Sequence, residues 1–268
     1  MSYTDASGRK VNTAQPGGHI DAAAYDTYGN TVRELTAANR QLALGGSGAA
    51  KERLTDLSLI DLGTAERADK LSTVTVYSDD GQREVEKLEP LHLGLLQGAL
   101  GGSGDQALIT AGTPVPLRKH TVSTHDEGRP SDAKTENLVT TTKTGAAIDG
   151  YATDADVRVT KTTYDWDLGL PTSETKDAGG LKLTTRTEYD GQGRVTKTTL
   201  PKSNGTDAGA TVTRYWSATG SGTCAGRPEW ADTVCSTGPA GTITGAAPTP
   251  PNCPPRPTST TGGATPPR

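Results

Sequence analysis

The chain has 268 residues, a formal net charge of −4 at pH 7, 32% hydrophobic residues and no phenylalanine. Its Lys and Arg residues are scattered, which argues against the concentrated basic patch of a nucleic-acid-binding protein. No apolar run is long enough to span a bilayer, and the first residues lack the apolar segment of a signal peptide. The low apolar content and abundant threonine predict many short, half-polar β-strands instead of one dense core.

The first predicted elements are β-hairpins marked by the pattern Tyr-Asp-x-x-Gly. Residues 25–29 place Asp26 and Gly29 at the first and fourth positions of a type I turn, directly after Tyr25. The Asp carboxylate can accept hydrogen bonds from the turn amides, and the Gly can take the left-handed conformation that closes a bulged hairpin. Residues 3–8 carry the same pattern with one residue inserted.

The strand pattern stops between Gly45 and Ser72. The Gly/Ser-rich residues 45–48 are typical of a flexible linker. Thr64 then stands where a helix N-cap is expected, with Glu66 in the first turn. We therefore predict a short α-helical insertion at about residues 49–71.

Hairpin patterns resume after the insertion. Tyr77 is followed by Ser78 and Gly81 at the first and fourth turn positions. Two later copies are degenerate: residues 125–129 replace Tyr with His and are one residue short, and residues 164–169 carry one extra residue. All three predict further strand–turn–strand units.

The clearest copy is centred on Asp190 and Gly193. The residues from Leu181 to Tyr189 alternate between two faces, as in a β-strand, and Pro201 ends the outgoing strand. The motif residues given a structural role across all copies are Tyr25, Asp26, Gly29, Tyr77, Gly81, Tyr164, Asp165, Tyr189, Asp190, Gly193 and Arg194.

The region before the C-terminal tail carries cysteine and tryptophan. Cys224 and Cys235 flank a turn-rich stretch, and both a disulfide and two free thiols are compatible with the sequence. Trp216 and Trp230 in the same region are candidates for stacking on sugar rings. Residues 245–268, including Cys253, are rich in Pro, Thr and Gly without periodicity, which predicts a disordered tail.

The repeated register resembles the YD repeats of the RHS repeat family. Tyr3, Tyr25, Tyr164, Tyr189 and Tyr215 include neighbours 22 to 26 residues apart, a period typical of repeat architectures. The resemblance covers about residues 1–244 and is strongest to the large bacterial RHS proteins, of which this chain is expected to be a fragment. It implies a mainly β fold of stacked antiparallel hairpins forming part of a hollow shell.

The same resemblance implies a function. RHS shells enclose a C-terminal toxin or, as in the related teneurins, present an adhesive surface. We therefore expect a non-catalytic wall segment of a secreted or cell-surface protein involved in toxin encapsulation and intercellular competition. The expected partners are the remaining repeats of the same or a longer RHS protein and an enclosed toxin domain. The alternative is a carbohydrate-binding or adhesive module that contacts surface glycans.

Motifs for other chemistry are weak. The sequence contains no phosphate-binding loop, no Gly-x-Ser-x-Gly elbow and no His-Glu-x-x-His pair. The acidic pairs at residues 79–80, 154–156 and 165–167 supply oxygen ligands of the kind calcium takes, but turn capping explains them better. We predict no enzymatic activity, cofactor, metal site, nucleic-acid partner or membrane span.

Overall fold

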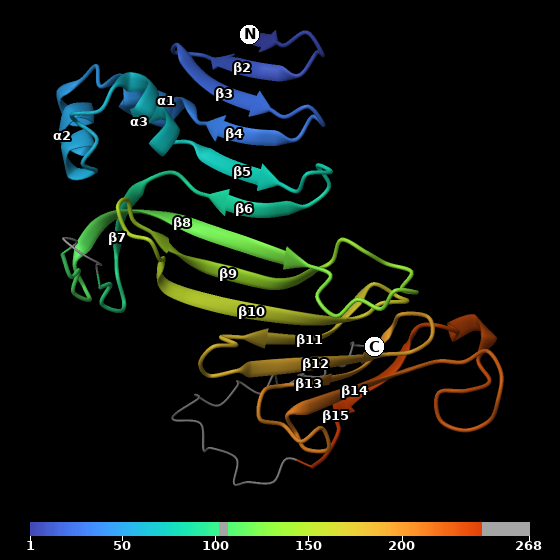
Figure 1. Ribbon diagram of the computed structural model, residues 1–268. Helices are drawn as coiled ribbons and strands as arrows, with labels where there is room; N and C mark the ends of the chain where they lie inside the picture. The colour runs from blue at the N-terminus through green and yellow to red at the C-terminus, as the bar shows by residue number, and fades with distance from the viewer. Residues whose placement is uncertain (102–106, 243–268) are drawn as a thin grey trace, which may run out of the picture.

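The computed structural model describes residues 1–101 and 107–242. It confirms the mainly β class: fifteen strands form one antiparallel sheet whose order follows the chain, and the sheet does not close (Figure 1). The strands are β1 (Ser2–Thr4), β2 (Lys10–Gln15), β3 (His19–Tyr25), β4 (Thr31–Leu35), β5 (Thr73–Tyr77), β6 (Glu84–Leu88), β7 (His92–Leu95), β8 (Pro114–His125), β9 (Val139–Ala147), β10 (Ala155–Asp165), β11 (Leu170–Lys176), β12 (Leu183–Tyr189), β13 (Val195–Thr199), β14 (Ala210–Tyr215) and β15 (Val234–Pro239).

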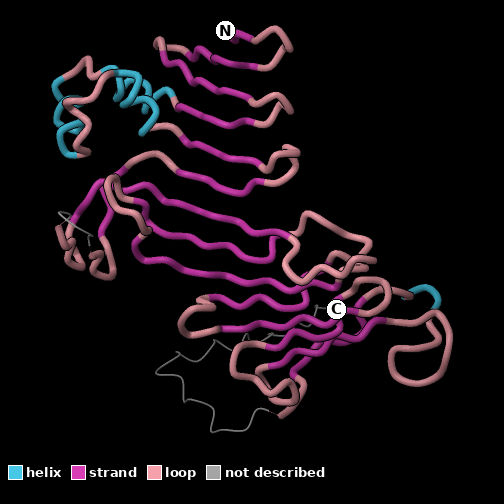
Figure 2. The backbone as a smooth tube through the Cα atoms, viewed as in Figure 1, coloured by secondary structure: helices cyan, strands magenta, loops and turns pink. Residues whose placement is uncertain are grey.

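Strict alternation of strand direction sorts the connections onto two edges of the sheet (Figure 2). The turns after β1, β3, β5, β8, β10, β12 and β14 lie along one edge, which we call the turn edge. Every Tyr-Asp-type turn belongs to it. Strand β7 pairs with the start of β8, whereas β6 pairs with its later part.

The three α-helices lie at the opposite edge, between β4 and β5 (Figure 1), whereas a short 3-10 helix, Pro228–Trp230, lies in the loop after β14. The α-helices are α1 (Ala37–Leu44), α2 (Gly48–Asp56) and α3 (Thr64–Lys70). The predicted insertion is therefore present but starts at Ala37, earlier than residue 49. Thr36 caps α1 by accepting a bond from the Asn39 amide, and the Asp21 carboxylate accepts one from the Ala37 amide.

Two details of the predicted insertion are wrong. Residues 45–48 do not form a flexible linker, because Gly45 ends α1 in the left-handed conformation and Ser47 caps α2 through the Ala50 amide. The N-cap of α3 is Gly63, not Thr64, and the Glu66 carboxylate accepts a bond from the Gly63 amide.

Large apolar residues gather at the helix-bearing edge. One cluster joins the helices to the sheet through Leu35, Ala43, Leu54, Leu57, Leu59, Leu71 and Leu91, and a second contains Leu96, Leu100, Leu117 and Ala155. Strands β11–β14 contribute to neither. A cross-strand hydroxyl pair, Thr175 with Thr184 at 2.9 Å, lies between β11 and β12 instead.

The strand predicted from Leu181 begins two residues later, at Leu183. Asp177 and Lys182 have positive φ, and the Lys182 amide donates to the Asp177 carbonyl, so a turn occupies the expected start. Leu181 is consequently 76% exposed. The predicted tail and Cys253 lie outside the described residues.

Candidate functional site

Local hydrogen bonds and one ion pair stabilise the turn at Asp190. The Gly193 amide donates to the Asp190 carbonyl at 2.9 Å, and Gly193 has φ +78°. The carboxylate of Asp190 accepts from the amides of Gln192 and Arg194 through Oδ1, and from the Arg194 guanidinium through Oδ2 at 2.7 Å. Asp5 and Arg9 make the same arrangement in the first hairpin. The Asp therefore closes the turn and also fixes the Arg.

The motif tyrosine reaches back to the preceding hairpin. Tyr189 Oη donates to the Pro171 carbonyl at 2.9 Å, and Tyr215 Oη donates to the Val195 carbonyl at 3.0 Å. Each acceptor lies at the start of the outgoing strand of the hairpin before. The same relation joins Tyr25 to Lys10 at 2.9 Å and Tyr164 to Val139 at 2.8 Å. Four hairpins are thus bonded to their predecessors by one side-chain type.

The turn arginine reaches forward. The Arg194 guanidinium lies over the Tyr215 ring, 4.4 Å from its centroid, and Arg9 lies over Tyr25 at 5.0 Å. Arg9 also donates to the Asp26 carbonyl of the next turn at 2.9 Å. These two pairs of successive hairpins are therefore joined in both directions, by a cation–π contact forward and a tyrosine hydrogen bond backward.

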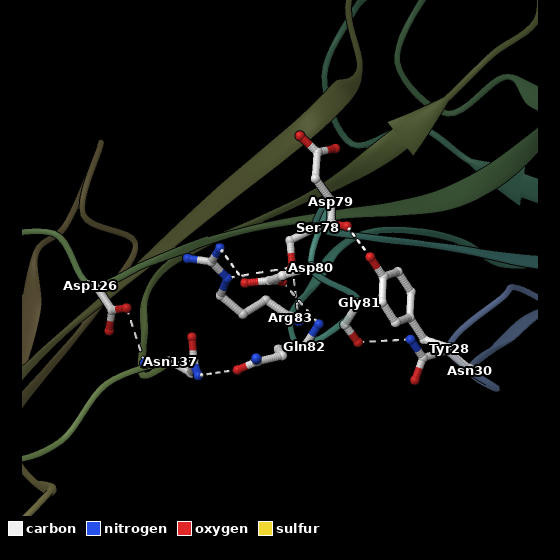
Figure 3. Close-up of polar contacts among 10 residues, drawn as sticks. All are labelled: Tyr28, Asn30, Ser78, Asp79, Asp80, Gly81, Gln82, Arg83, Asp126 and Asn137. Carbon is white, nitrogen blue, oxygen red and sulfur yellow. Dashed lines mark hydrogen bonds and ion pairs between the residues drawn. The ribbon is translucent and has the colours of Figure 1, made fainter.

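In the middle of the turn edge, contacts run directly from turn to turn (Figure 3). Tyr28 Oη donates to the Asp79 carbonyl at 2.8 Å, and Asn30 Nδ2 donates to the Gly81 carbonyl at 2.7 Å. The next turn continues the row, because Asn137 Nδ2 donates to Gln82 Oε1 at 3.1 Å. These bonds join segments about 50 residues apart in sequence.

The Tyr28 ring packs closely on Gly81. Gly81 has φ +73°, and a Cβ placed there would lie 2.5 Å from two carbons of the ring. Any larger residue at position 81 would therefore strain the backbone and collide with the ring. Sequence reasoning identified Gly81 for its turn but missed this second constraint.

The degenerate copy at residues 125–129 forms its local turn, because the Arg129 amide donates to the Asp126 carbonyl at 3.1 Å and Gly128 has φ +77°, but the hairpin does not close there. The turn runs on to Leu138, whose carbonyl accepts from the Asp126 amide. The Asp126 carboxylate accepts from the amides of Asn137 and Leu138, and Asn137 has φ +63°. Asn137 thus takes the position of the motif Gly. The signal in the sequence is an Asn two residues before the next strand, since Asn tolerates this conformation better than most residues.

The turn carboxylates are electrostatically stabilised. The side-chain hydrogen bond from Arg194, followed by the bond from its amide, lowers the pKa of Asp190 below its usual value of 3.8. The Arg9 amide, with the Arg9 side chain and the Ser7 amide, lowers the pKa of Asp5. For Tyr77 the shift is upward, because burial and then the Glu84 carboxylate raise the pKa of its hydroxyl.

The last turn forms a separate aromatic loop, residues 216–233. A disulfide joins Cys224, within the loop, to Cys235 in β15, with Cα atoms 5.6 Å apart. The Trp216 and Trp230 rings meet edge to face at 5.0 Å between centroids, and Arg227 lies over Trp230 at 5.3 Å. Trp230 is 47% exposed. The structure thus brings together the two predicted sugar-stacking residues.

Two of the acidic pairs each contribute an aspartate that accepts hydrogen bonds from backbone amides. Asp165 accepts from the Asp167 and Leu168 amides, and Asp156 accepts from the Gln97 and Gly98 amides. Across residues 1–101 and 107–242, no three His, Cys, Asp or Glu residues are close enough to hold a metal ion together. None of the helices in that part of the chain combines the length and apolar character needed to cross a membrane.

The chain shows little similarity to known proteins. No family model matches the chain, and no curated protein does. Among solved structures, the chain is weakly similar to a component of a Photorhabdus luminescens Tc holotoxin pore, at 15% identity and a TM-score of 0.23. The match covers 80% of this chain but only 13% of that one. A TM-score this low supports no argument about shared fold or function.

Proposed function

We propose that this chain is a non-catalytic wall segment of an RHS-type protein that is secreted or displayed on the cell surface. The wall would enclose a toxin domain used in intercellular competition, and its direct partners would be further repeats of the same kind. The observation that carries this proposal is the joining of successive hairpins along the turn edge, by tyrosine hydrogen bonds in four hairpins and by arginine–tyrosine contacts in two of them. The motif residues there bond to neighbouring hairpins and turns, which is what a wall requires.

The distribution of apolar side chains supports the same proposal. Both buried clusters lie toward the helix-bearing edge, and β11–β14 are held by strand pairing, one hydroxyl pair and the motif contacts. A sheet held in this way does not need other layers of secondary structure packed on its two faces. Repeat proteins of this kind gain their stability from contacts between neighbouring units.

Electron cryo-microscopy of the chain produced with its flanking coding sequence tests this proposal. We expect strands β1–β15 to line a lumen that holds a second polypeptide, and we expect that polypeptide to resist proteases until the wall is opened. A sheet packed against a solid core, with no enclosed space, would contradict the proposal. So would a finding that the chain alone is a compact monomer with its sheet closed on itself.

A carbohydrate-binding or adhesive role is the second candidate, and the aromatic loop favours it. Trp230 is half-exposed beside Trp216, with Arg227 and Glu229 at its margin. An exposed indole and neighbouring charged groups suit a sugar, which offers apolar C–H faces and hydroxyls. A glycan array with tryptophan fluorescence tests it. Trp230→Ala should abolish binding while Trp166→Ala, at the turn after β10, should not; equal behaviour of the two variants would exclude this role for the loop.

A further inference from the structure

The loop between β13 and β14 carries a motif that the wall proposal does not use. Its residues Asn204, Gly205 and Thr206 form the sequence Asn-x-Thr. An Asn followed two residues later by Ser or Thr, with no Pro between them, is the acceptor pattern for N-linked glycosylation. No other Asn in the sequence has Ser or Thr at that distance. The loop lies on the edge opposite the turn edge, away from the contacts that join the hairpins.

Asp207 holds the backbone of this loop in place. Its carboxylate accepts a hydrogen bond from the Ser203 hydroxyl and another, at 3.2 Å, from the Asn204 amide. Gly205 is buried and has φ +85°, a conformation that glycine adopts without strain. The side chains of Asn204 and Thr206, in contrast, are exposed. The motif is therefore presented to solvent on a loop whose backbone is fixed.

Thr206 fixes the Asn204 carboxamide. Asn204 Oδ1 accepts hydrogen bonds from the Thr206 amide at 2.8 Å and from the Thr206 hydroxyl at 3.0 Å. The bond to the amide two residues further on is that of an Asx turn. Nδ2 makes no hydrogen bond to any residue that the structure describes. The carboxamide oxygen is thus engaged, while the nitrogen, the atom that receives the sugar, is open to solvent.

We propose that Asn204 is an N-glycosylation site and that Thr206 prepares its carboxamide for the reaction. The sugar donor is a sugar joined through C1 to a diphosphate, which a nucleotide or a lipid carries, and a glycosyltransferase brings it to the loop. Nδ2 gives one proton to a base of that enzyme and forms a bond to C1. The bond between C1 and the diphosphate oxygen breaks, and its electron pair leaves with the diphosphate.

The two hydrogen bonds from Thr206 act on the charge in this step. As Nδ2 loses its proton, negative charge develops on Oδ1 of the carboxamide. The Thr206 amide and hydroxyl already point at that oxygen, and fixed donors at a developing oxyanion lower the barrier to reaction. Thr206 is therefore a positioning residue, and the glycosyltransferase supplies the catalytic groups.

Two parallel reactions on the purified full chain test the site. One contains a soluble N-glycosyltransferase with UDP-glucose, and the other contains a membrane oligosaccharyltransferase with a lipid-diphosphate oligosaccharide. Peptide mapping by mass spectrometry should place the sugar on Asn204 in at least one reaction, and the reaction that succeeds identifies the carrier. An unmodified Asn204 in both reactions, or its conversion to aspartate alone, would overturn the inference.

Variants of the motif separate the two side chains. Asn204→Gln should abolish modification, because the acceptor nitrogen is displaced. Thr206→Ala should also abolish it, since the hydroxyl bond to Oδ1 is lost, and Thr206→Ser should restore it. Circular dichroism of each variant should match the parent, because both side chains are exposed. Full modification of Thr206→Ala would show that the hydroxyl has no role.

A second motif placed in the same chain is the matched control. Val32→Thr creates the acceptor pattern at Asn30, whose Nδ2 already donates to Asp26 Oδ2 at 3.0 Å and to the Gly81 carbonyl at 2.7 Å. In the folded variant, Asn30 should stay unmodified while Asn204 reacts. Equal modification of the two would overturn the inference, because the sequence motif alone would then suffice. Neither outcome bears on the wall proposal, since Asn204 lies outside the turn edge.

Discussion

Asp190 uses its two carboxylate oxygens for different purposes: Oδ1 binds the turn amides and Oδ2 holds the Arg194 side chain. Arg194, once fixed, lies over Tyr215 of the next hairpin and bonds Asp232 beyond it. A charged hydrogen bond therefore orients a cation–π contact between repeats. This explains why Asp, Gly and Arg recur together in one motif.

Gly81 gives the first prediction. Gly81→Ala should destabilise the protein by more than the roughly 1 kcal/mol expected for a positive-φ glycine alone, because the new Cβ would also collide with the Tyr28 ring. Urea unfolding measures the loss. Gly8→Ala is the matched control: its φ is +79° and its Cβ would meet nothing within 4 Å. Equal losses for the two variants would refute the Tyr28 constraint, whereas Tyr28→Ala should reduce the cost at position 81.

The turn carboxylates give a pH-dependent prediction. The Arg194 side chain and amide lower the pKa of Asp190 in the folded chain, and the Arg9 amide does so first for Asp5. As the pH falls, the unfolded chain therefore binds protons before the folded one. The stabilisation is fully present above about pH 4 to 5 and is lost as the pH falls through the folded-state pKa.

Urea midpoints measured between pH 6 and pH 2.5 test this effect, together with carbon-13 titration of the Asp carboxyl groups. Asp190→Asn should be less stable than the parent at pH 6 and should lose less stability on acidification. A parent protein whose midpoint stays constant down to pH 3 would contradict the prediction.

At the scale of elements, the sequence predicts what is local. The hairpin turns follow from Asp and Gly three residues apart, because the bonds that close them lie within that span. The bonds that join hairpins were not predicted, since no pattern within a single motif indicates which distant carbonyl Tyr189 will reach. Helix α1 was missed for a related reason: part of its cap is Asp21, sixteen residues away in β3. The role of Asn137 was not predicted for the same reason, because its partner Asp126 lies at the other end of the long turn after β8.

The helical insertion gives a prediction at this scale. Leu54 is fully buried in the cluster that joins α1–α3 to the sheet. Leu54→Ala should cost about 2–5 kcal/mol locally. Because each hairpin contacts mainly its neighbours, amide exchange should accelerate in α1–α3 and β4 but not in β11–β13. Leu96→Ala, in the second cluster, is the control and should loosen the region around β7. Uniform acceleration in either variant would mean that the array unfolds as a single unit.

For the whole molecule, the open sheet has two end strands with different capacities for pairing. Strand β1 is exposed at all three residues, and β15 ends in Gly238 and Pro239. Unpaired strand edges promote association between chains. We predict that the isolated chain self-associates with increasing concentration, and that it does so mainly through β1.

Light scattering coupled to size-exclusion chromatography tests this prediction on the full chain. Tyr3→Lys should shift the average mass toward the monomer, because a charged side chain at an edge opposes strand pairing. Ser236→Lys, an equivalent change in β15, should have a smaller effect if that end is already blunted by proline. A monodisperse monomer with a sharp, cooperative thermal transition at every concentration would show that the chain protects its own edges. The carbohydrate-binding or adhesive role would then be favoured over the wall segment.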